Sequence, residues 1–250
     1  SLRKRIKMRL IAIIFLSLVI LIKFDVIQVS LLGQTEIRYL FIFAFGLVGY
    51  AFISPYMYLF LSNRTEVDRT WLQQHIPEME TQQVTTYIGE LPFKPNLFAS
   101  GSGHRKVIAI DRRIEQALSI EELKFFILHE YSHIKDHDIL KLRLMRSVVV
   151  ALIPIIALLV SRTIHFNNVL LLLIFVVIVL SLYISGFFLF FHYARLKELK
   201  CDRFAAQFTS KTAQRQAFEK FIALGIMEDT KVKLMSTHPS LQQRLNHLNI

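Results

Sequence analysis

Two histidines and a glutamate lie within five consecutive residues, in the order His129-Glu130-Tyr131-Ser132-His133. On a helix, the two imidazoles stand one turn apart on the same face, where both can bind one zinc ion. Glu130, beside the first histidine, can act as a general base toward a water that the zinc activates, which is the chemistry of peptide-bond hydrolysis. We therefore predict a catalytic site that holds one Zn²⁺ per chain, with His129 and His133 as two of its ligands.

A catalytic zinc needs a third protein ligand and one open coordination position. An extended motif with glycine at position 136 and histidine at position 139 is absent, because Asp136 and Ile139 stand there. A carboxylate from a distant helix is the other solution, and Glu198 is the strongest candidate. Asp202 lies one turn further along the same helix face and can accept a hydrogen bond from a ligand imidazole. The alternative is that Glu198 and Asp202 belong to a solvated charged surface, and these two residues alone do not decide between the interpretations.

Local sequence signals indicate which elements position these side chains. Ser119 followed by Glu122 forms a capping box, which predicts the start of the helix that carries the histidines. Residues 84–88 and 106–110 are predicted to be short strands on either side of a stretch rich in glycine and proline. Because the remainder has helical patterning, the expected fold class is mainly α with a small β-sheet.

The composition indicates a membrane protein. Hydrophobic residues make up 53% of the chain and the mean hydropathy is +0.43, which is too apolar for an ordinary soluble domain. A bilayer core needs about 20 apolar residues per helical span, and four such stretches are present, at residues 9–29, 39–61, 144–164 and 169–193. A cleaved signal peptide is the alternative for the first stretch, but no small-residue cleavage site follows it. Pro154 allows the third stretch to be tilted, kinked or re-entrant.

The basic residues are distributed unevenly around these spans. Of the 30 lysines and arginines, 27 fall in residues 1–9, 62–146 and 194–250. The positive-inside rule places these segments, and with them both termini and the active site, on the cytoplasmic side. The net charge of +11 is thereby explained by topology, and no nucleic-acid partner is expected. The single cysteine, Cys201, excludes an intramolecular disulfide and fits a reducing compartment.

These assignments divide the chain into four parts. Residues 1–61 are expected to form an N-terminal membrane region with two spans, and residues 144–193 a second membrane hairpin with two more. The polar segments 62–146 and 194–250 are expected to fold together as one catalytic domain, because together they suffice for only one modest core. The protein is thus predicted to be polytopic, with about four transmembrane helices.

The motifs resemble those of membrane zinc metallopeptidases of the HtpX and CAAX prenyl protease type, over most of residues 90–245. In that family an aspartate follows the histidine motif after five residues, as Asp138 does here, and a downstream R-x-x-E-x-x-A-D supplies the third ligand. Glu198 and Asp202 stand in register with that pattern, and Cys201 replaces its alanine. The resemblance implies a zincin-like catalytic domain in which Glu198 is the third zinc ligand, with Asp138 and Asp202 supporting the ligands.

A second matching segment precedes the histidine motif. The sequence KPNLFASG, with Asn96, Phe98 and Ala99, is similar to the family's N-A-F-A-x-G segment, although Leu97 departs from the pattern. The resemblance implies that this segment forms an edge strand along which the substrate lies extended, recognised through its backbone more than its side chains.

A third match lies near the end of the sequence. THPSLQQRL is similar to the family's H-P-x-x-x-x-R, with His238 and Arg244 in the matching positions. The resemblance implies that His238 stabilises the oxyanion or positions substrate, and Arg244 is grouped with it as a substrate or transition-state residue. The alternative for His238, a structural turn histidine before proline, stays open. His137, one turn beyond His133, is expected to be solvated.

The expected function is that of a zinc-dependent membrane endopeptidase that hydrolyses membrane or membrane-associated proteins, as in HtpX-like quality control. Its expected partners are the lipid bilayer and a membrane-protein or peptide substrate, in the bacterial cytoplasmic membrane. One alternative is a dedicated protease that processes a prenylated protein, a small peptide precursor or a regulator. Four spans favour the HtpX-like branch, because the CAAX prenyl type carries more. Another alternative is a non-catalytic zinc-binding scaffold or sensor, which Glu130 disfavours because a structural zinc site has no use for a general base.

Overall fold

The computed structural model divides the chain into two units, Ser1–Leu61 and Ser62–Ile250. The residues that the structure describes are 63–91, 95–102, 105–153, 168–227 and 236–250, with the isolated residues 42, 46, 49, 156 and 160. The predicted span 9–29 lies outside these described residues. Of the predicted span 39–61, only residues 42, 46 and 49 are described. Of the predicted span 144–164, residues 144–153, 156 and 160 are described.

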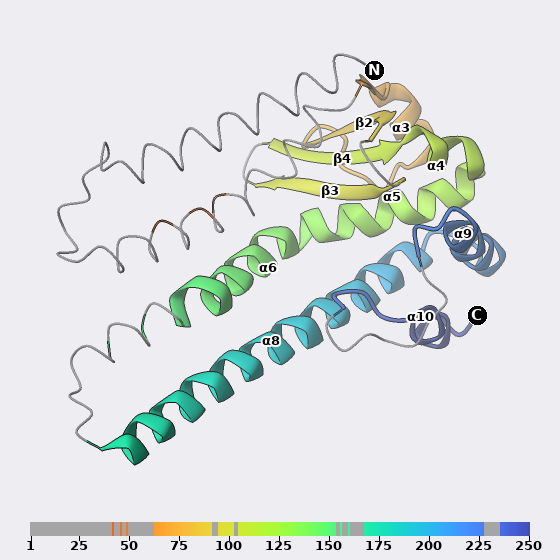
Figure 1. The fold of residues 1–250 in the computed structure, drawn as a ribbon. Helices are drawn as coiled ribbons and strands as arrows, with labels where there is room; N and C mark the ends of the chain where they lie inside the picture. Colours follow the sequence, from red (N-terminus) through yellow and green to blue (C-terminus); the bar gives the residue numbers. More distant parts are fainter. Residues whose placement is uncertain are drawn as a thin grey trace. The chain divides into compact units, whose positions relative to one another are not determined.

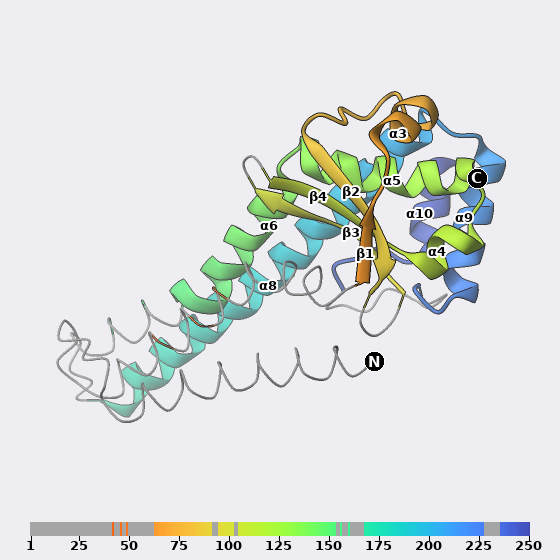
Figure 2. The same cartoon turned by 90° about the horizontal axis from the view of Figure 1, so that it is seen from above.

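A mixed sheet of four strands forms one layer of the second unit (Figures 1 and 2). Its strands are β1 (Asn63–Glu66), β2 (Val84–Glu90), β3 (Leu97–Ser102) and β4 (Arg105–Asp111), in the spatial order β1-β2-β4-β3. β2 and β4 pair in parallel, whereas β1 and β3 each pair antiparallel with their neighbour. The expected small sheet is confirmed, and β2 and β4 contain the two strands predicted from the sequence.

The two outer strands carry weaker sequence signals. β1 consists of four exposed, mostly polar residues, so it has no alternation of apolar and polar positions. β3 was expected as an edge strand through the family resemblance, and it does lie at the edge of the sheet. Gly89 in β2 permits the close approach of β1, because a Cβ atom there would lie 2.6 Å from the carbonyl oxygen of Asn63.

The helix that carries the histidine motif is α5 (Ile120–Lys135), which packs against β3 and β4. The predicted capping box is confirmed at its start. The Ser119 hydroxyl accepts a hydrogen bond from the Glu122 N–H, and the Glu122 carboxylate accepts one of 2.6 Å from the Ser119 N–H. Because these bonds satisfy two backbone donors at the helix end, they fix where α5 begins and therefore which residues face its neighbours.

An aromatic cluster joins α5 to α9 (Lys211–Ala223). Phe126 stacks on Phe221 with ring centroids 3.6 Å apart, and Phe125 meets Phe218 edge-on at 5.4 Å. All four rings are buried in the main apolar core between the sheet and the helices. This packing fixes α5 between the sheet and the C-terminal helices. The remaining short helices are α3 (Arg69–His75), α4 (Arg112–Ala117) and α10 (Leu241–Leu248).

A turn separates α5 from the next helix, α6 (Asp138–Ser147). His137 forms this turn in the left-handed region, with φ of 56°, and its side chain is exposed as predicted. A π-helical turn, η2 (Val148–Leu152), follows α6. The start of the third predicted span is therefore helical in the residues that are described.

The longest helix is α8 (Val169–Ala206), with 38 residues. The most apolar stretch of α8 has a mean hydropathy of 2.9, and none of its residues is buried. The helix is long and apolar enough to cross a membrane. Within the described residues it is the one helix that meets these conditions. The proposed boundary between residues 193 and 194 falls inside this continuous helix, so the same rigid element runs from the apolar segment into the polar one.

Candidate metal centre

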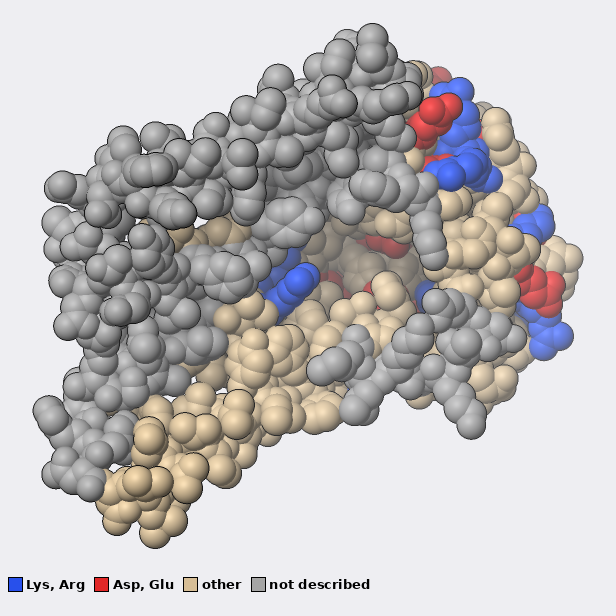
Figure 3. Space-filling view, in the orientation of Figure 1, with Lys and Arg blue, Asp and Glu red and all other residues tan. Residues whose placement is uncertain are grey.

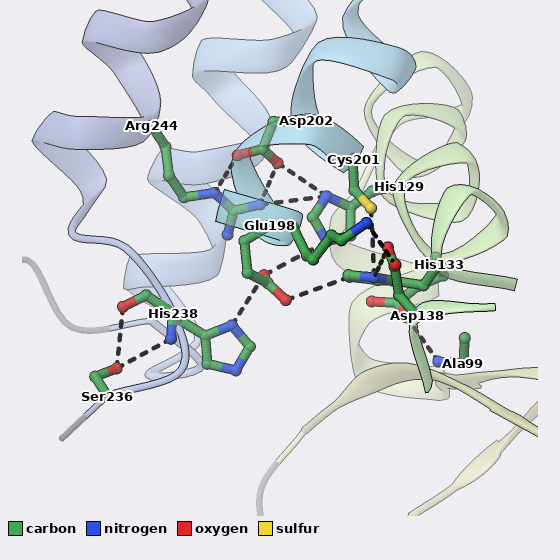
Figure 4. A network of polar contacts seen from close by, with 12 residues as sticks. Ala99, His129, His133, Asp138, Glu198, Cys201, Asp202, Ser236, His238 and Arg244 are labelled. Atoms are coloured by element: carbon green, nitrogen blue, oxygen red, sulfur yellow. Dashed lines mark hydrogen bonds and ion pairs between the residues drawn. The ribbon is translucent and has the colours of Figure 1, made fainter. Parts of the chain in front are cut away.

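Helices α5 and α8 pack against each other and bring together residues that are far apart in the sequence (Figures 1 and 4). The Nε2 atom of His133 lies 3.2 Å from one carboxylate oxygen of Glu198, and Nε2 of His129 lies 3.6 Å from the other. The two imidazole centroids are 5.0 Å apart, as expected for residues one helical turn apart. All three side chains are buried. The structure therefore gathers the three predicted zinc ligands at one point.

Behind the first histidine, a buried carboxylate holds the imidazole. His129 Nδ1 lies 2.9 Å from Oδ1 of Asp202, which is fully buried. Burial alone would lower the pKa of His129, but the hydrogen bonds to Asp202 and Glu198 outweigh it and raise this pKa to about 9. Asp202 thus occupies the supporting position that was expected for it, with the Nε2 atom of His129 left to face Glu198.

Behind the second histidine lies a different set of groups. His133 Nδ1 lies 3.3 Å from the Cys201 thiol and 3.6 Å from a carboxylate oxygen of Asp138. Asp138 is fully buried, and its other oxygen lies 3.0 Å from the ammonium of Lys197. Burial lowers the pKa of His133, but the surrounding carboxylates and thiol raise it well above its ordinary value.

Glu198 is surrounded by histidines. Besides the two on α5, His238 places its Nδ1 atom 2.9 Å from a carboxylate oxygen of Glu198. Burial would raise the pKa of Glu198, but the positive charge of His238 and the hydrogen bonds from all three imidazoles hold it well below its usual range. The carboxylate therefore stays ionised, which a metal ligand requires. The interpretation of Glu198 as part of a solvated surface is wrong, because the residue is only 8% exposed.

Arg244 lies in a position that was not expected. Its guanidinium is buried and forms two bonds to Asp202, one of them 2.6 Å from Nε. The same group lies 4.8 Å from the ring centre of Phe218 in the apolar core. Because it stands behind His129, on the Nδ1 side of that ring, it is placed to hold Asp202. The structure thus gives Arg244 a contact with Asp202, and a contact between Arg244 and substrate stays a prediction.

His238 lies in a turn and also contacts Glu198. Its backbone N–H donates to the Ser236 hydroxyl, which in turn donates to the His238 carbonyl, so the residue does form a turn. Its ring nevertheless points at Glu198 (Figure 4), and its side chain is 66% exposed. One edge of the imidazole is therefore engaged in the site while the rest is open to solvent.

The expected general base contacts the edge strand. One carboxylate oxygen of Glu130, Oε2, accepts a hydrogen bond of 2.6 Å from the backbone N–H of Ala99. Burial is the main reason that the pKa of Glu130 is raised, and the nearby imidazoles His129 and His133 oppose it. A carboxylate with a raised pKa is suited to taking up and releasing a proton near neutral pH.

The other two residues expected on the edge strand, Asn96 and Phe98, take part in its pairing with β4. Asn96 accepts a bond from the Asp111 N–H through its carbonyl, and its side chain accepts one from the Leu97 N–H. Phe98 lies opposite Ala109 of β4. Of the three residues of this segment that were expected to meet substrate, Ala99 forms a hydrogen bond with Glu130.

Two residues of the site were missed or given another role. Lys197 was not singled out in the sequence, yet it pairs with buried Asp138. Cys201 was noted only as the single cysteine and as a replacement for alanine, yet its thiol contacts His133. A signal existed for Cys201, because it lies three residues after Glu198 and so on the same helix face.

The donor set fits a zinc ion. One atom each from His129, His133 and Glu198 lie within 4.8 Å of one another, and two imidazole nitrogens with one carboxylate oxygen are ligands of catalytic zinc sites. A second group, formed by His133, Asp138 and Cys201, meets the same distance condition. That group is the poorer fit, because the Lys197 ammonium already neutralises Asp138 and would repel a cation. In the space-filling view, acidic side chains lie at the bottom of a hollow in this part of the molecule (Figure 3).

One protein family and two named proteases are similar to this chain in sequence. Residues 69–249 match the family described as Peptidase family M48. The "Protease HtpX homolog" of Neisseria meningitidis is 25% identical over 210 residues, which cover 74% of each chain. The protein of the same name from Dictyoglomus turgidum is 26% identical over 192 residues, or 66% of this chain and 62% of that protein.

Among solved structures, the crystal structure of S. mikatae Ste24p has a similar fold. The TM-score is 0.65 at 16% sequence identity, and the match covers 98% of this chain and 64% of Ste24p. The present chain thus spans slightly less than two thirds of the length of that protein.

Proposed function

Because this chain belongs to peptidase family M48, we propose that it is a zinc-dependent endopeptidase of the membrane, with one zinc held by His129, His133 and Glu198. The observation that carries the proposal is the convergence of these three buried side chains from α5 and α8 beside Glu130. Family membership explains why a general base stands next to the first ligand. A scaffold or sensor would need the ligands alone.

The supporting residues prepare the ligands for a metal ion. Asp202 and Arg244 hold His129 from its Nδ1 side, and Asp138 and Cys201 lie at the Nδ1 atom of His133. With both Nδ1 atoms engaged, the Nε2 atoms are the ones available as ligands. When bound there, zinc supplies a Lewis acid that polarises the scissile carbonyl and lowers the pKa of a water molecule.

Glu130 transfers the protons. Its carboxylate takes a proton from the attacking water and later gives it to the leaving amine. The burial that raises the pKa of Glu130 suits both steps, because the group must be a base first and an acid afterwards. His238, with Nδ1 toward Glu198 and its other edge exposed, is placed to donate a hydrogen bond to the developing oxyanion.

The substrate is proposed to be a membrane or membrane-associated protein. Helix α8 carries an apolar stretch long enough to span a bilayer and continues directly to Glu198, which would hold the site close to the membrane surface. β3 provides a sheet edge along which an extended peptide can lie. The clustering of basic residues in the polar segments supports a cytoplasmic location for the site.

Cleavage by the purified protein tests this function. The protein is reconstituted in lipid vesicles with zinc and mixed with a partly unfolded membrane protein, and the fragments are measured. Glu130→Gln should keep its zinc and lose cleavage, because only the base is removed. Glu219→Gln makes the same chemical change on an exposed face of α9 and should cleave normally. Cleavage that persists in Glu130→Gln would exclude the proposed mechanism.

A dedicated processing protease is the second candidate. General turnover and processing of one precursor differ in what accumulates when the base is removed. Comparing the membrane proteome of cells with the active protein and with Glu130→Gln distinguishes them. Many accumulating membrane proteins are expected for quality control, whereas one accumulating precursor would indicate dedicated processing.

A further inference from the structure

The orientation of backbone groups along β3 follows from its register with β4. The Asp111 N–H donates to the Asn96 carbonyl at 3.0 Å, so these two residues face each other as a hydrogen-bonded pair. In an antiparallel pair, the backbone N–H and C=O groups of successive residues point alternately toward the partner strand and away from it. Phe98 and Ser100 therefore direct their N–H and C=O groups toward β4, while those of Ala99 point to the open edge.

At this edge the Ala99 N–H is already engaged. It donates to Oε2 of Glu130 at a distance of 2.6 Å. Among the described residues, it is the sole hydrogen-bond donor to this carboxylate. The donor belongs to a strand held in a sheet, and the acceptor to a helix fixed by its capping box and aromatic packing. The bond therefore joins two rigid elements.

We propose that the Ala99 N–H is a positioning group for Glu130, which fixes one carboxylate oxygen so that the other acts as the base. This inference rests on the proposed function of Glu130. The terminal torsion of a glutamate side chain has a broad, weakly defined energy minimum. A carboxylate held at one oxygen by a backbone donor keeps its second oxygen in a constant direction, which a proton transfer requires.

A consequence concerns how a peptide pairs with β3. A strand added to an edge normally exchanges two hydrogen bonds with each outward-facing residue. Within the described part of the chain the Ala99 carbonyl accepts no hydrogen bond, so it can accept one from a substrate N–H, whereas the N–H of Ala99 is used by Glu130. The substrate therefore forms one bond at this residue, and its own carbonyl at that point is free to turn toward the metal ligands.

Ala99→Pro removes this donor with little effect on the sheet, because an outward N–H contributes nothing to the ladder. With a protein substrate, kcat should fall about ten- to a hundredfold, which corresponds to the loss of one hydrogen bond to a charged group in the transition state. KM, zinc content and the unfolding midpoint should stay close to those of the parent protein. A merely structural role would lower the midpoint or the zinc content together with kcat.

The opposite edge of the sheet offers a matched control. The Val67 N–H donates to the Thr86 carbonyl, so Glu66, one residue earlier in β1, directs its N–H away from β2. Glu66→Pro thus removes an outward N–H from the other edge, far from Glu130 in the sheet order, and should leave kcat unchanged.

A second variant and a spectroscopic readout cover the case in which the proline disturbs folding. Replacing the amide of Ala99 by a backbone ester removes the same hydrogen and keeps the side chain. In protein stripped of metal, the infrared band of the Glu130 carboxylate is isolated by subtracting the spectrum of Glu130→Gln. The inference predicts that this band shifts in the ester variant and that kcat falls after zinc is restored.

An unshifted band, or normal kcat in a folded variant, would overturn the inference. Inactivity of Glu130→Gln in the same assay would show that the proposed function still stands. Full activity of Glu130→Gln would instead mean that the proposed function itself has failed.

Discussion

The Nδ1 atom of His129 lies 2.9 Å from a carboxylate oxygen of Asp202, a residue 73 positions later in the chain. Because an ionised carboxylate accepts but cannot donate, this contact holds a proton on Nδ1, so Nε2 is the nitrogen that a metal ion can bind after displacing any proton there. The contact also brings α8 into register with α5, since Asp202 and Glu198 lie on one face of α8. One hydrogen bond thus both orients a predicted ligand and joins α5 to the helix that carries the third one.

Asp202→Asn should weaken zinc binding about 10- to 100-fold, the usual effect of losing a group that orients a ligand histidine. The neutral amide is a poorer acceptor and can present its NH₂ group to the ring. Zinc affinity is measured by competition with a chromogenic chelator, with Glu219→Gln as the control. Unchanged affinity in Asp202→Asn would show that the contact does not prepare the ligand.

Arg244→Leu should destabilise the protein by about 3–5 kcal/mol, because it leaves the carboxylate of Asp202 buried without its partner. Thermal or denaturant unfolding in detergent measures the change. The double variant Arg244→Leu with Asp202→Asn should recover part of the loss, since no unpaired charge remains. Normal stability with a raised KM in Arg244→Leu would instead indicate that Arg244 contacts substrate.

Lys220→Met should lower stability at neutral pH by up to about 1 kcal/mol, given that the lysine is partly exposed. Burial raises the pKa of Glu122, but the bonds from Lys220 and Ser119 outweigh it and lower that pKa below its ordinary 4.5. A depressed pKa in the folded state means that the stabilisation is present above the unfolded value and is lost as the pH falls through the folded one.

The difference in unfolding free energy between the parent and Lys220→Met should therefore be constant above pH 4.5 and disappear in more acidic solution. Unfolding curves at several pH values measure this dependence. A difference that stays the same in acid would show that the ion pair is not its source.

Cys201→Ala should retain one zinc per chain and change activity by no more than about a factor of three, as expected for a small substitution. Asp138 remains beside Nδ1 of His133 to receive its proton. Metal analysis and the cleavage assay on the same preparation check both expectations. Loss of the zinc would show that the thiol is itself a ligand.

The parts of the site that the sequence predicted are those set by helix periodicity. His129 and His133 come to one face because they are one turn apart, and Glu198 and Asp202 do so for the same reason. That these two faces meet could be expected only through the family resemblance. No local pattern specifies which helices pack together across 65 or more residues.

The contacts that the sequence did not predict depend on packing or on the backbone. The Ala99 N–H has no signature in residue type, so its bond to Glu130 could not be read from the chain. Lys197 and Arg244 resemble ordinary surface cations until the buried carboxylates that pair with them are placed. Among the strands, β2 and β4 were predicted because they combine apolar and β-branched residues, whereas the exposed β1 has no apolar residue.

X-ray absorption at the zinc edge of the purified, reconstituted protein tests the proposed metal centre most directly. Coordination by His129, His133 and Glu198 predicts one zinc per chain with nitrogen and oxygen neighbours at about 2.0–2.2 Å and no sulfur. The absorption spectrum of Cys201→Ala should then be the same as that of the parent. A sulfur neighbour at about 2.3 Å that disappears in Cys201→Ala would contradict this centre and place the zinc between His133, Asp138 and Cys201.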